Sequence, residues 1–413
     1  MTKKRFPGWV AVATGLTLTV VASAQARPAE RVALREDGVT SNRIVFGGTA
    51  PLSGAASAFA SVARGAEAYF KYVNSKGGVN GRTIEYRYRD DAYNPAQTLQ
   101  VVRELVEEDK VFAVFNTLGT EQNQPAREYL NQRGVPQLFV ASGATSFGRD
   151  YKQYPWTIGY QPSYIAEGYI YGRWLARDKP NQKIAILFQN DDYGKDLIAG
   201  FKRGLGRKGT IVAQEGYEVT ATDVQSQIAK LKASGAKVLM LFATPKFAIQ
   251  SFVIANKLAW RPLIVNNVVS SASNIMSLAS EGNTNKSIEG SVSIVFLKDP
   301  TDPKWAKDPA IKLYRSIMSR YAKGQNVKDV YHVYGMAVAH TMVGVLKRAG
   351  RNVTRAGVMR AARSINEPNN PFLLPQISVR TSGADQFPIE QAQLQRWSKG
   401  KWTSFGNLWG YRG

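Results

Sequence analysis

Short apolar runs alternate with amphipathic segments along most of the chain. The first apolar run begins at Ile44, before a loop at 49–57, and is bounded by glycine and proline, which is typical of a buried parallel strand. Apolar residues at helical spacing over 59–70 then predict a helix. The same reasoning predicts further strands at 83–89, 111–115, 136–140, 183–189, 211–217, 237–242 and 263–267.

Helices are expected between and after these strands. Asn94 and Pro95 are residue types favoured at an N-cap and at a first helical position, so a helix should begin there. Other helical patterns cover 224–234, 246–257, 309–321, 331–348 and 354–364. Regular alternation of strands and helices indicates the α/β class with two parallel-sheet domains, which is also a natural organisation for 413 residues.

Several strands should end in loops of small and hydroxyl-bearing residues, at 49–57, 116–120 and 141–146. Their hydroxyls and backbone N–H groups would lie beside helix N-termini, and this favours an anionic or carboxylate group on a ligand. The loop 49–57 lacks the G-x-G-x-x-G spacing and the lysine of a P-loop, so it does not predict a nucleotide site.

The first 26 residues have the pattern of a signal peptide. Lys3, Lys4 and Arg5 form a positive start, residues 9–21 are apolar, and small residues around Ala26 offer a cleavage site. No cysteine stands near that site, so no lipid anchor is expected, and we predict an exported, periplasmic protein. The chain has no cysteine at all, which rules out thiol nucleophiles and cysteine-based metal sites.

The net charge and the candidate catalytic residues exclude further classes of function. The net charge is +23, but the basic residues are scattered singly, so we predict no nucleic-acid partner. The pairs Asp90-Asp91 and Asp191-Asp192 are better explained as caps and turns than as paired catalytic acids. His332 and His340 are the only histidines and share one predicted helix, so no Ser-His-Asp set is expected. We therefore predict neither an enzyme nor a cofactor or metal.

Several short motifs occur in order along the chain, at 49–54, 74–82, 90–91, 123–126, 143–145 and 191–194. Together they resemble the periplasmic solute-binding proteins of branched-chain amino acid ABC importers. The resemblance implies the type I periplasmic-binding-protein fold, with two Rossmann-like lobes joined by three crossovers. It places lobe 1 at 42–161 plus 297–366 and lobe 2 at 162–296 plus 367–413. It also implies a monomer that delivers a small carboxylate or amino-acid ligand to a permease at the inner membrane.

The resemblance further implies which residues bind the ligand. Hydroxyls and backbone N–H groups of the first lobe should hold a carboxylate, and aromatic and polar side chains should line the rest of the cleft. The corresponding positions in this chain, with their immediate neighbours, are Phe59, Gly119, Thr120, Gly143, Ala144, Thr145, Tyr193, Thr244 and Tyr331. From the aromatic stretch 151–174 we add Tyr160 and Tyr164 as rings that could stack on a ligand.

Two positions depart from the family pattern. The acids that hold an α-ammonium in amino-acid-binding members align with Tyr164 and Val268. A buried ammonium without a carboxylate partner costs several kcal/mol, so we hypothesise an aromatic or branched acid without an amine. Asp191, Asp192 or Glu167 could replace the missing acids, which leaves the amino-acid alternative open. A ligand-sensing protein of the same fold is the alternative function.

Overall fold

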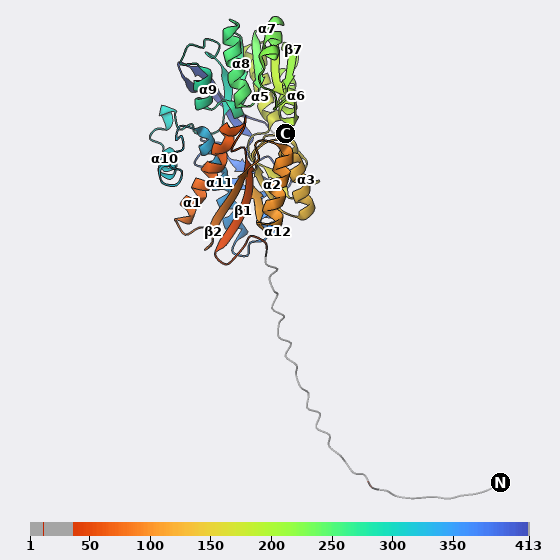
Figure 1. The fold of residues 1–413 in the computed structure, drawn as a ribbon, viewed down its shortest axis with the longest axis vertical. Helices are drawn as coiled ribbons and strands as arrows, with labels where there is room; N and C mark the ends of the chain where they lie inside the picture. Colours follow the sequence, from red (N-terminus) through yellow and green to blue (C-terminus); the bar gives the residue numbers. More distant parts are fainter. Residues whose placement is uncertain (1–10, 12–35, 412–413) are drawn as a thin grey trace, which may run out of the picture. The chain divides into compact units, whose positions relative to one another are not determined.

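The computed structural model describes Ala11 and residues 36–411, so the predicted signal peptide lies, except for Ala11, outside the described residues. Residues 36–411 contain two large sheets (Figure 1). We call each sheet, with the helices packed on it, a lobe. The first sheet is parallel throughout, with strand order β2-β1-β3-β4-β5. Its strands are β1 Arg43–Ala50, β2 Thr83–Asp90, β3 Ala113–Phe115, β4 Gln137–Val140 and β5 Thr157–Gly159.

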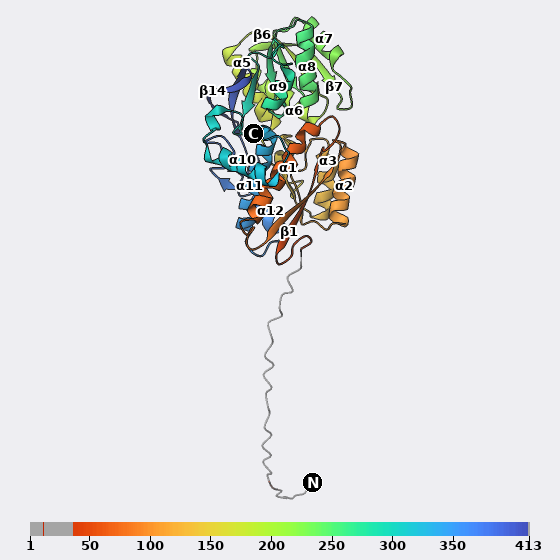
Figure 2. The ribbon, with the colours of Figure 1, turned by 60° about the vertical axis from the view of Figure 1, so that its left-hand side comes forward.

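Helices from two distant parts of the sequence cover the first sheet. Figures 1 and 2 show α1 and α11 near β1, with α2 and α3 adjacent to one another. The predicted cap is confirmed, because the Asn94 side chain accepts hydrogen bonds from the N–H groups of Ala96 and Gln97. The helices are α1 Ala60–Asn74, α2 Pro95–Glu107, α3 Asn123–Arg133, α4 Ser146–Arg149, α10 Pro309–Tyr321, α11 Val330–Ala349 and α12 Arg355–Ala362.

The second sheet has the order β14-β13-β10-β9-β8-β6-β7. Strands β6 to β10 are parallel; strands were predicted at β6 to β9 but not at β10. Strands β13 and β14 add an antiparallel hairpin that was not predicted either. The strands are β6 Gln182–Gln189, β7 Gly209–Tyr217, β8 Val238–Phe242, β9 Leu263–Asn266, β10 Val292–Val295, β13 Gln391–Ser398 and β14 Lys401–Gly410. The helices are α5 Tyr164–Asp178, α6 Asp192–Leu205, α7 Gln225–Ala233, α8 Pro245–Lys257 and α9 Ser273–Ala279.

The chain passes between the lobes three times, at 160–163, 296–308 and 381–390. Short 3-10 turns η1 Ser57–Phe59, η2 Val268–Ser270 and η3 Pro303–Trp305 lie in connecting segments, and β11 Asn366–Glu367 pairs with β12 Val379–Arg380. Phe372, Val379 and Ile389 pack in the same apolar cluster as residues of β1 and α1. The lobe boundaries stay a prediction.

Glycines let two helix pairs approach closely, one pair in each lobe. A Cβ on Gly335 of α11 would lie 2.1 Å from the carbonyl oxygen of Val62 in α1, and a Cβ on Gly200 of α6 would lie 2.1 Å from that of Ile165 in α5. These distances are far below van der Waals contact, so no side chain fits there. The pairs matter for function because α1, α5, α6 and α11 all begin at the cavity described next.

Candidate ligand-binding cleft

A cavity of about 890 Å³, open space at its mouth included, lies between the two lobes. Its wall is mainly aromatic and aliphatic, with Gln161, Thr244, Ser271, Asp299 and Gln395 as polar members. Among the described residues, no lysine, arginine or histidine lines it. The seven aromatic residues of the wall are Phe59, Tyr93, Tyr164, Tyr193, Phe296, Tyr331 and Tyr334.

Besides α1, whose N-cap is Phe59, four helices of more than ten residues begin at this cavity. Tyr164 is the first residue of α5, Tyr193 lies in the first turn of α6, Thr244 is the N-cap of α8, and Tyr331 lies in the first turn of α11. Helix N-termini carry partial positive charge and unpaired N–H groups. The cavity is therefore electropositive at several points although no cationic side chain lines it.

Two of these helices already have an acidic cap. Asp191 caps α6 by accepting the N–H of Gly194, and Asp329 caps α11 by accepting the N–H of Tyr331. Burial raises the pKa of each carboxyl to about 6, against the opposing effect of its hydrogen bonds. The other two helices, α5 and α8, have Ser163 and Thr244 as neutral caps. Glu167 lies in the first turn of α5, however, so α8 alone among these four helices has no acidic side chain at its start.

On the first-lobe side, the cavity wall includes Phe59 and Tyr331. Their rings meet edge to face with centroids 5.3 Å apart. The Tyr331 hydroxyl donates a 2.7 Å hydrogen bond to the carbonyl of Val269 in η2, and so connects the two lobes beside the cavity. Gly119 also lines the cavity.

On the second-lobe side, Tyr164, Tyr193, Thr244 and Val268 line the cavity. The rings of Tyr164 and Tyr193 meet edge to face at 4.8 Å. The N–H of Thr244 donates to the hydroxyl of the buried Tyr217 at 3.0 Å, which fixes the start of α8. The structure thus brings together seven of the twelve residues that the sequence analysis proposed.

The remaining five proposed residues do not line the cavity. Tyr160 is fully buried beside it, and its hydroxyl is 3.1 Å from the Thr341 hydroxyl. Thr120 is buried, and its hydroxyl is 2.7 Å from that of Ser142. The other three, Gly143, Ala144 and Thr145, belong to the segment 141–146, which we call the hydroxyl loop. Ala141 at the start of this loop lines the cavity, whereas Gly143 packs against the Tyr164 ring.

Sequence reasoning missed three further aromatic wall residues, Tyr93, Phe296 and Tyr334. Tyr334 could have been found, because it lies one helical turn after Tyr331 and so shares its face of α11. Tyr93 follows the strand end at Asp91 with a positive φ of 61°, a conformation for which the sequence carried no signal. Phe296 lies in a crossover segment that showed no regular pattern.

Glu167 is a buried acid directly behind the wall. One carboxyl oxygen accepts the N–H of Val268 at 2.6 Å and the hydroxyl of Tyr171 at 2.8 Å. Burial raises the pKa of this carboxyl to about 7, although both hydrogen bonds act in the opposite direction. The sequence analysis considered Glu167 only as a substitute ammonium ligand. The structure instead shows it holding the loop that carries Val268.

The chemistry expected of an enzyme is not assembled in residues 36–411. No group of three histidine, cysteine, aspartate or glutamate residues in this range could hold a metal ion. His332 is buried and burial lowers its pKa to about 4, while His340 bonds to the Tyr69 hydroxyl and to Glu367. Within the described part of the chain, no helix is both long and apolar enough to span a membrane.

Comparison with known families identifies the family to which the chain belongs. The profile of a family described as "Periplasmic binding protein" matches residues 43–401. The chain therefore belongs to this family. This confirms the resemblance seen in the sequence and the type I periplasmic-binding-protein fold. Membership of a family of binding proteins also agrees with the prediction that the chain is not an enzyme.

Individual relatives are more distant. The Leu/Ile/Val-binding protein homolog 2 of Brucella abortus is 32% identical over 198 residues, which are 48% of this chain and 53% of that protein, so the match spans about half the length of the relative. A branched-chain amino acid ABC transporter structure from Thermus thermophilus with bound valine has a TM-score of 0.79 at 17% identity, covering 90% of this chain and 98% of that one.

A second solved structure carries a different ligand. A solute-binding protein of an ABC transporter from Rhodopseudomonas palustris BisB5, in complex with 3,4-dihydroxybenzoic acid, has a TM-score of 0.74 at 16% identity. The match covers 89% of this chain and 97% of that protein. At such identities, both structures establish the fold that this chain shares with them.

Proposed function

We propose that this chain is the extracytoplasmic substrate-binding protein of an ABC importer, and that its ligand is a small aromatic or branched carboxylic acid without an α-ammonium group. The ligand would be held between the lobes and delivered to a permease at the inner membrane. The predicted signal peptide without a lipid anchor, the periplasmic location and the monomeric state belong to this proposal.

The observation that supports the ligand class is a cavity wall in which Asp299 is the one acid among the described residues. Tyr164 and Val268 line it at the positions where the family pattern places acids. The one carboxylate among the described wall residues, Asp299, already accepts hydrogen bonds from the Ser273 hydroxyl at 2.6 Å and from Thr301. Asp299 would therefore be the one acidic partner in the described wall for a ligand ammonium, and three of its acceptor sites are already occupied, so desolvation of the ammonium would be poorly offset.

An acid group fits the same cavity better. The N-terminus of α8, which has no acidic side chain in its first turn, reaches the wall at Thr244 and favours negative charge. The aromatic rings offer an apolar surface to the ligand body. The comparisons support both the amino-acid and the aromatic-acid class in other proteins of this fold, since one solved neighbour contains valine and another contains 3,4-dihydroxybenzoic acid.

A thermal-shift screen of the mature protein tests this proposal. The probes are matched pairs that differ only in the amine, namely leucine with 4-methylpentanoate, valine with 3-methylbutanoate and phenylalanine with 3-phenylpropanoate, together with benzoate and 4-hydroxybenzoate. A ligand at 100 times its Kd should stabilise the fold by roughly 2.7 kcal/mol. We expect shifts with acids alone. If the amino acids raise the melting temperature and the matched acids without the amine do not, the proposed ligand class is wrong.

A further inference from the structure

We propose that residues 301–328, which comprise η3, α10 and the loop after α10, bind the anionic surface of a phospholipid membrane. We call the exposed surface of this segment the basic face. None of these residues lines the cavity, so the inference goes beyond the proposed ligand. From the proposed function it takes only the location of the protein outside the cytoplasm, beside the inner membrane.

The positive charge of the chain is unevenly distributed. Residues 36–161 contain thirteen basic and thirteen acidic residues, whereas residues 162–411 contain thirty-four basic and seventeen acidic ones. Seven of the basic residues belong to the segment 301–328, and all seven are exposed. The five lysines among them are Lys304, Lys307, Lys312, Lys323 and Lys328. Basic residues that are scattered singly along the sequence are therefore gathered on one part of the surface.

No exposed acid of the segment neutralises the basic face. Residues 301–328 contain two aspartates, and both are half-buried caps. Asp302 accepts the N–H of Lys304 at the start of η3, and Asp308 accepts the N–H of Ala310 at the start of α10. Asp308 also pairs with Lys298 at 2.9 Å, and this is the one ion pair that the segment forms within residues 36–411. The seven exposed basic side chains therefore form no ion pair with the described chain.

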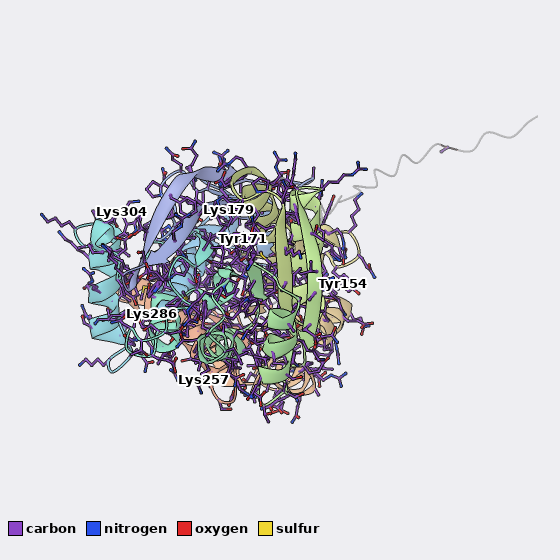
Figure 3. All side chains as sticks on the ribbon, turned by 90° about the horizontal axis from the view of Figure 1, so that it is seen from above. Tyr154, Tyr171, Lys179, Lys257, Lys286 and Lys304 are labelled. Atoms are coloured by element: carbon purple, nitrogen blue, oxygen red, sulfur yellow. The ribbon has the colours of Figure 1, made fainter. Side chains whose placement is uncertain are left out.

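Helix α10 presents this charge outward. Ile311 and Tyr314 pack in the apolar cluster that also contains residues of β1 and α1, whereas Lys312 and Arg320 are on the exposed side of the helix. Figure 1 shows α10 at one edge of the molecule, and Figure 3 shows it in cyan at the same edge, with Lys304 labelled beside it. The basic face therefore lies on an outer helix, where an extended surface can meet it.

The side chains of the basic face fit a diffuse anionic surface better than a single anionic group. Lysine is a point charge on a flexible stem, whereas arginine binds phosphate and carboxylate through a rigid bidentate fork. The guanidinium of Arg315 already donates to the carbonyls of Pro300 at 3.0 Å and Ala306 at 3.3 Å. Val327, which is 40% exposed, adds an apolar side chain next to Lys328. Clustered basic residues with apolar side chains beside them are features of protein surfaces that bind anionic membranes.

Binding of this kind is reversible, because it is mainly electrostatic and is screened by salt. It would keep the protein close to the membrane that contains the permease without fixing it there. The ligand cavity would stay accessible, since the basic face does not overlap it.

Co-sedimentation of the mature protein with lipid vesicles tests the proposal. The probes are vesicles of phosphatidylcholine with about one third phosphatidylglycerol, and vesicles of phosphatidylcholine alone. We expect the protein to bind the anionic vesicles at ~0.05 M salt and to be released from them at ~0.5 M salt, with little binding to the neutral vesicles.

Two variants with the same loss of charge separate the basic face from the net charge of the protein. In the first variant, four lysines of the basic face become glutamine. Each lysine at an anionic membrane strengthens partitioning by roughly fivefold, so partitioning should fall at least ~10-fold. In the second variant, four exposed lysines elsewhere become glutamine, and partitioning should fall less than ~3-fold. The first combines Lys307→Gln, Lys312→Gln, Lys323→Gln and Lys328→Gln, and the second combines Lys110→Gln, Lys202→Gln, Lys208→Gln and Lys257→Gln.

Equal losses in the two variants would overturn the basic face as the binding surface. Equal binding of the wild type to both kinds of vesicle would overturn the membrane as its partner. Both variants should keep the melting temperature of the wild type within a few degrees, because all the substituted side chains are exposed. Failure of the proposed function is separate, since the wild type would then bind none of the acids, whatever its binding to vesicles.

Discussion

The carboxylate of Asp196 in the second lobe accepts the backbone N–H of Thr145 in the first lobe at 2.7 Å. This contact lies next to the cavity and joins the loop after β4 to helix α6. Burial raises the pKa of Asp196 against the effect of the hydrogen bond. Other hydrogen bonds also join the lobes beside the cavity: the Tyr331 hydroxyl donates to the Val269 carbonyl, and the Tyr164 N–H donates to the Gly143 carbonyl.

Replacing Asp196 with alanine should favour an open arrangement of the lobes. The Thr145 N–H would be unpaired when the lobes are closed but hydrated when they are open, and a charge-assisted hydrogen bond contributes roughly 1.5–3 kcal/mol. We expect a larger radius of gyration in small-angle scattering without ligand, and an affinity for acids that is roughly tenfold lower. Asp178→Ala, which removes an exposed aspartate paired with Arg177, is the control. Identical scattering from Asp196→Ala and the wild type would contradict this role.

Glu167 should make stability depend on pH. Its pKa is raised by burial to about 7 in the fold from an ordinary value of 4.5, so the folded protein binds the proton more tightly than the unfolded chain. This contribution is fully present below pH 4.5 and is lost as pH rises through about 7, for a total of about 3 kcal/mol. Glu167→Gln should lose this dependence and should be more stable than the wild type at pH 8, measured by urea unfolding between pH 4 and 8.

The exposed Glu108 provides the matched control. Glu108→Gln should follow the pH profile of the wild type. If the stability of Glu167→Gln follows the same pH profile as the wild type, Glu167 is not the cause of the pH dependence of stability.

The close helix pairs should tolerate no side chain at their contact points. Gly335→Ala places a Cβ 2.1 Å from the Val62 carbonyl, so α11 must shift from α1, and we expect destabilisation by roughly 1–3 kcal/mol. Gly344 lies on the exposed side of the same helix with nothing within 4 Å, and Gly344→Ala should stabilise by roughly 0.5–1 kcal/mol. Chemical denaturation measures both, and equal effects would contradict the packing argument.

The ligand class should be switchable at two positions. Tyr164→Asp combined with Val268→Glu places acids where the family pattern has them, so leucine binding should appear by titration calorimetry while 4-methylpentanoate binding weakens. The matched control is Tyr164→Asn with Val268→Gln, which has nearly the same shape without the charge and should not bind leucine. If the acidic variant still binds 4-methylpentanoate more tightly than leucine, these two positions do not determine the ligand class.

The fold was predictable from the sequence because its central strands and many of its helices follow strong local patterns. The strand at β1 and the Asn94 cap are examples in which the residue types alone decide the structure. The hairpin β13–β14 was not predictable, because its short apolar runs acquire meaning only through pairing with β10, about a hundred residues earlier. Helix α5 was hidden by its aromatic residues, whose burial depends on contacts with α6 and the second sheet.

The site was only partly predictable, for a related reason. Phe59, Tyr193 and Tyr331 line the cavity because each of them lies where its helix begins, so a sequence motif is enough to locate them. The hydroxyl loop carries the expected residue types, but Tyr164 and Asp196 reach it from the second lobe. A sequence motif cannot show that a side chain more than twenty residues away has taken its hydrogen-bond donors.

The most direct measurement is the affinity of the wild-type protein for one matched pair, 3-phenylpropanoate and phenylalanine, by isothermal titration calorimetry at pH 7. The two probes share the ring and the carboxylate and differ by the α-ammonium. Because an unpaired buried ammonium costs several kcal/mol and each 1.4 kcal/mol is tenfold, we predict that the acid binds at least ~100-fold more tightly. Equal affinity, or tighter binding of phenylalanine, would contradict the assignment of this cavity to acids without an amine.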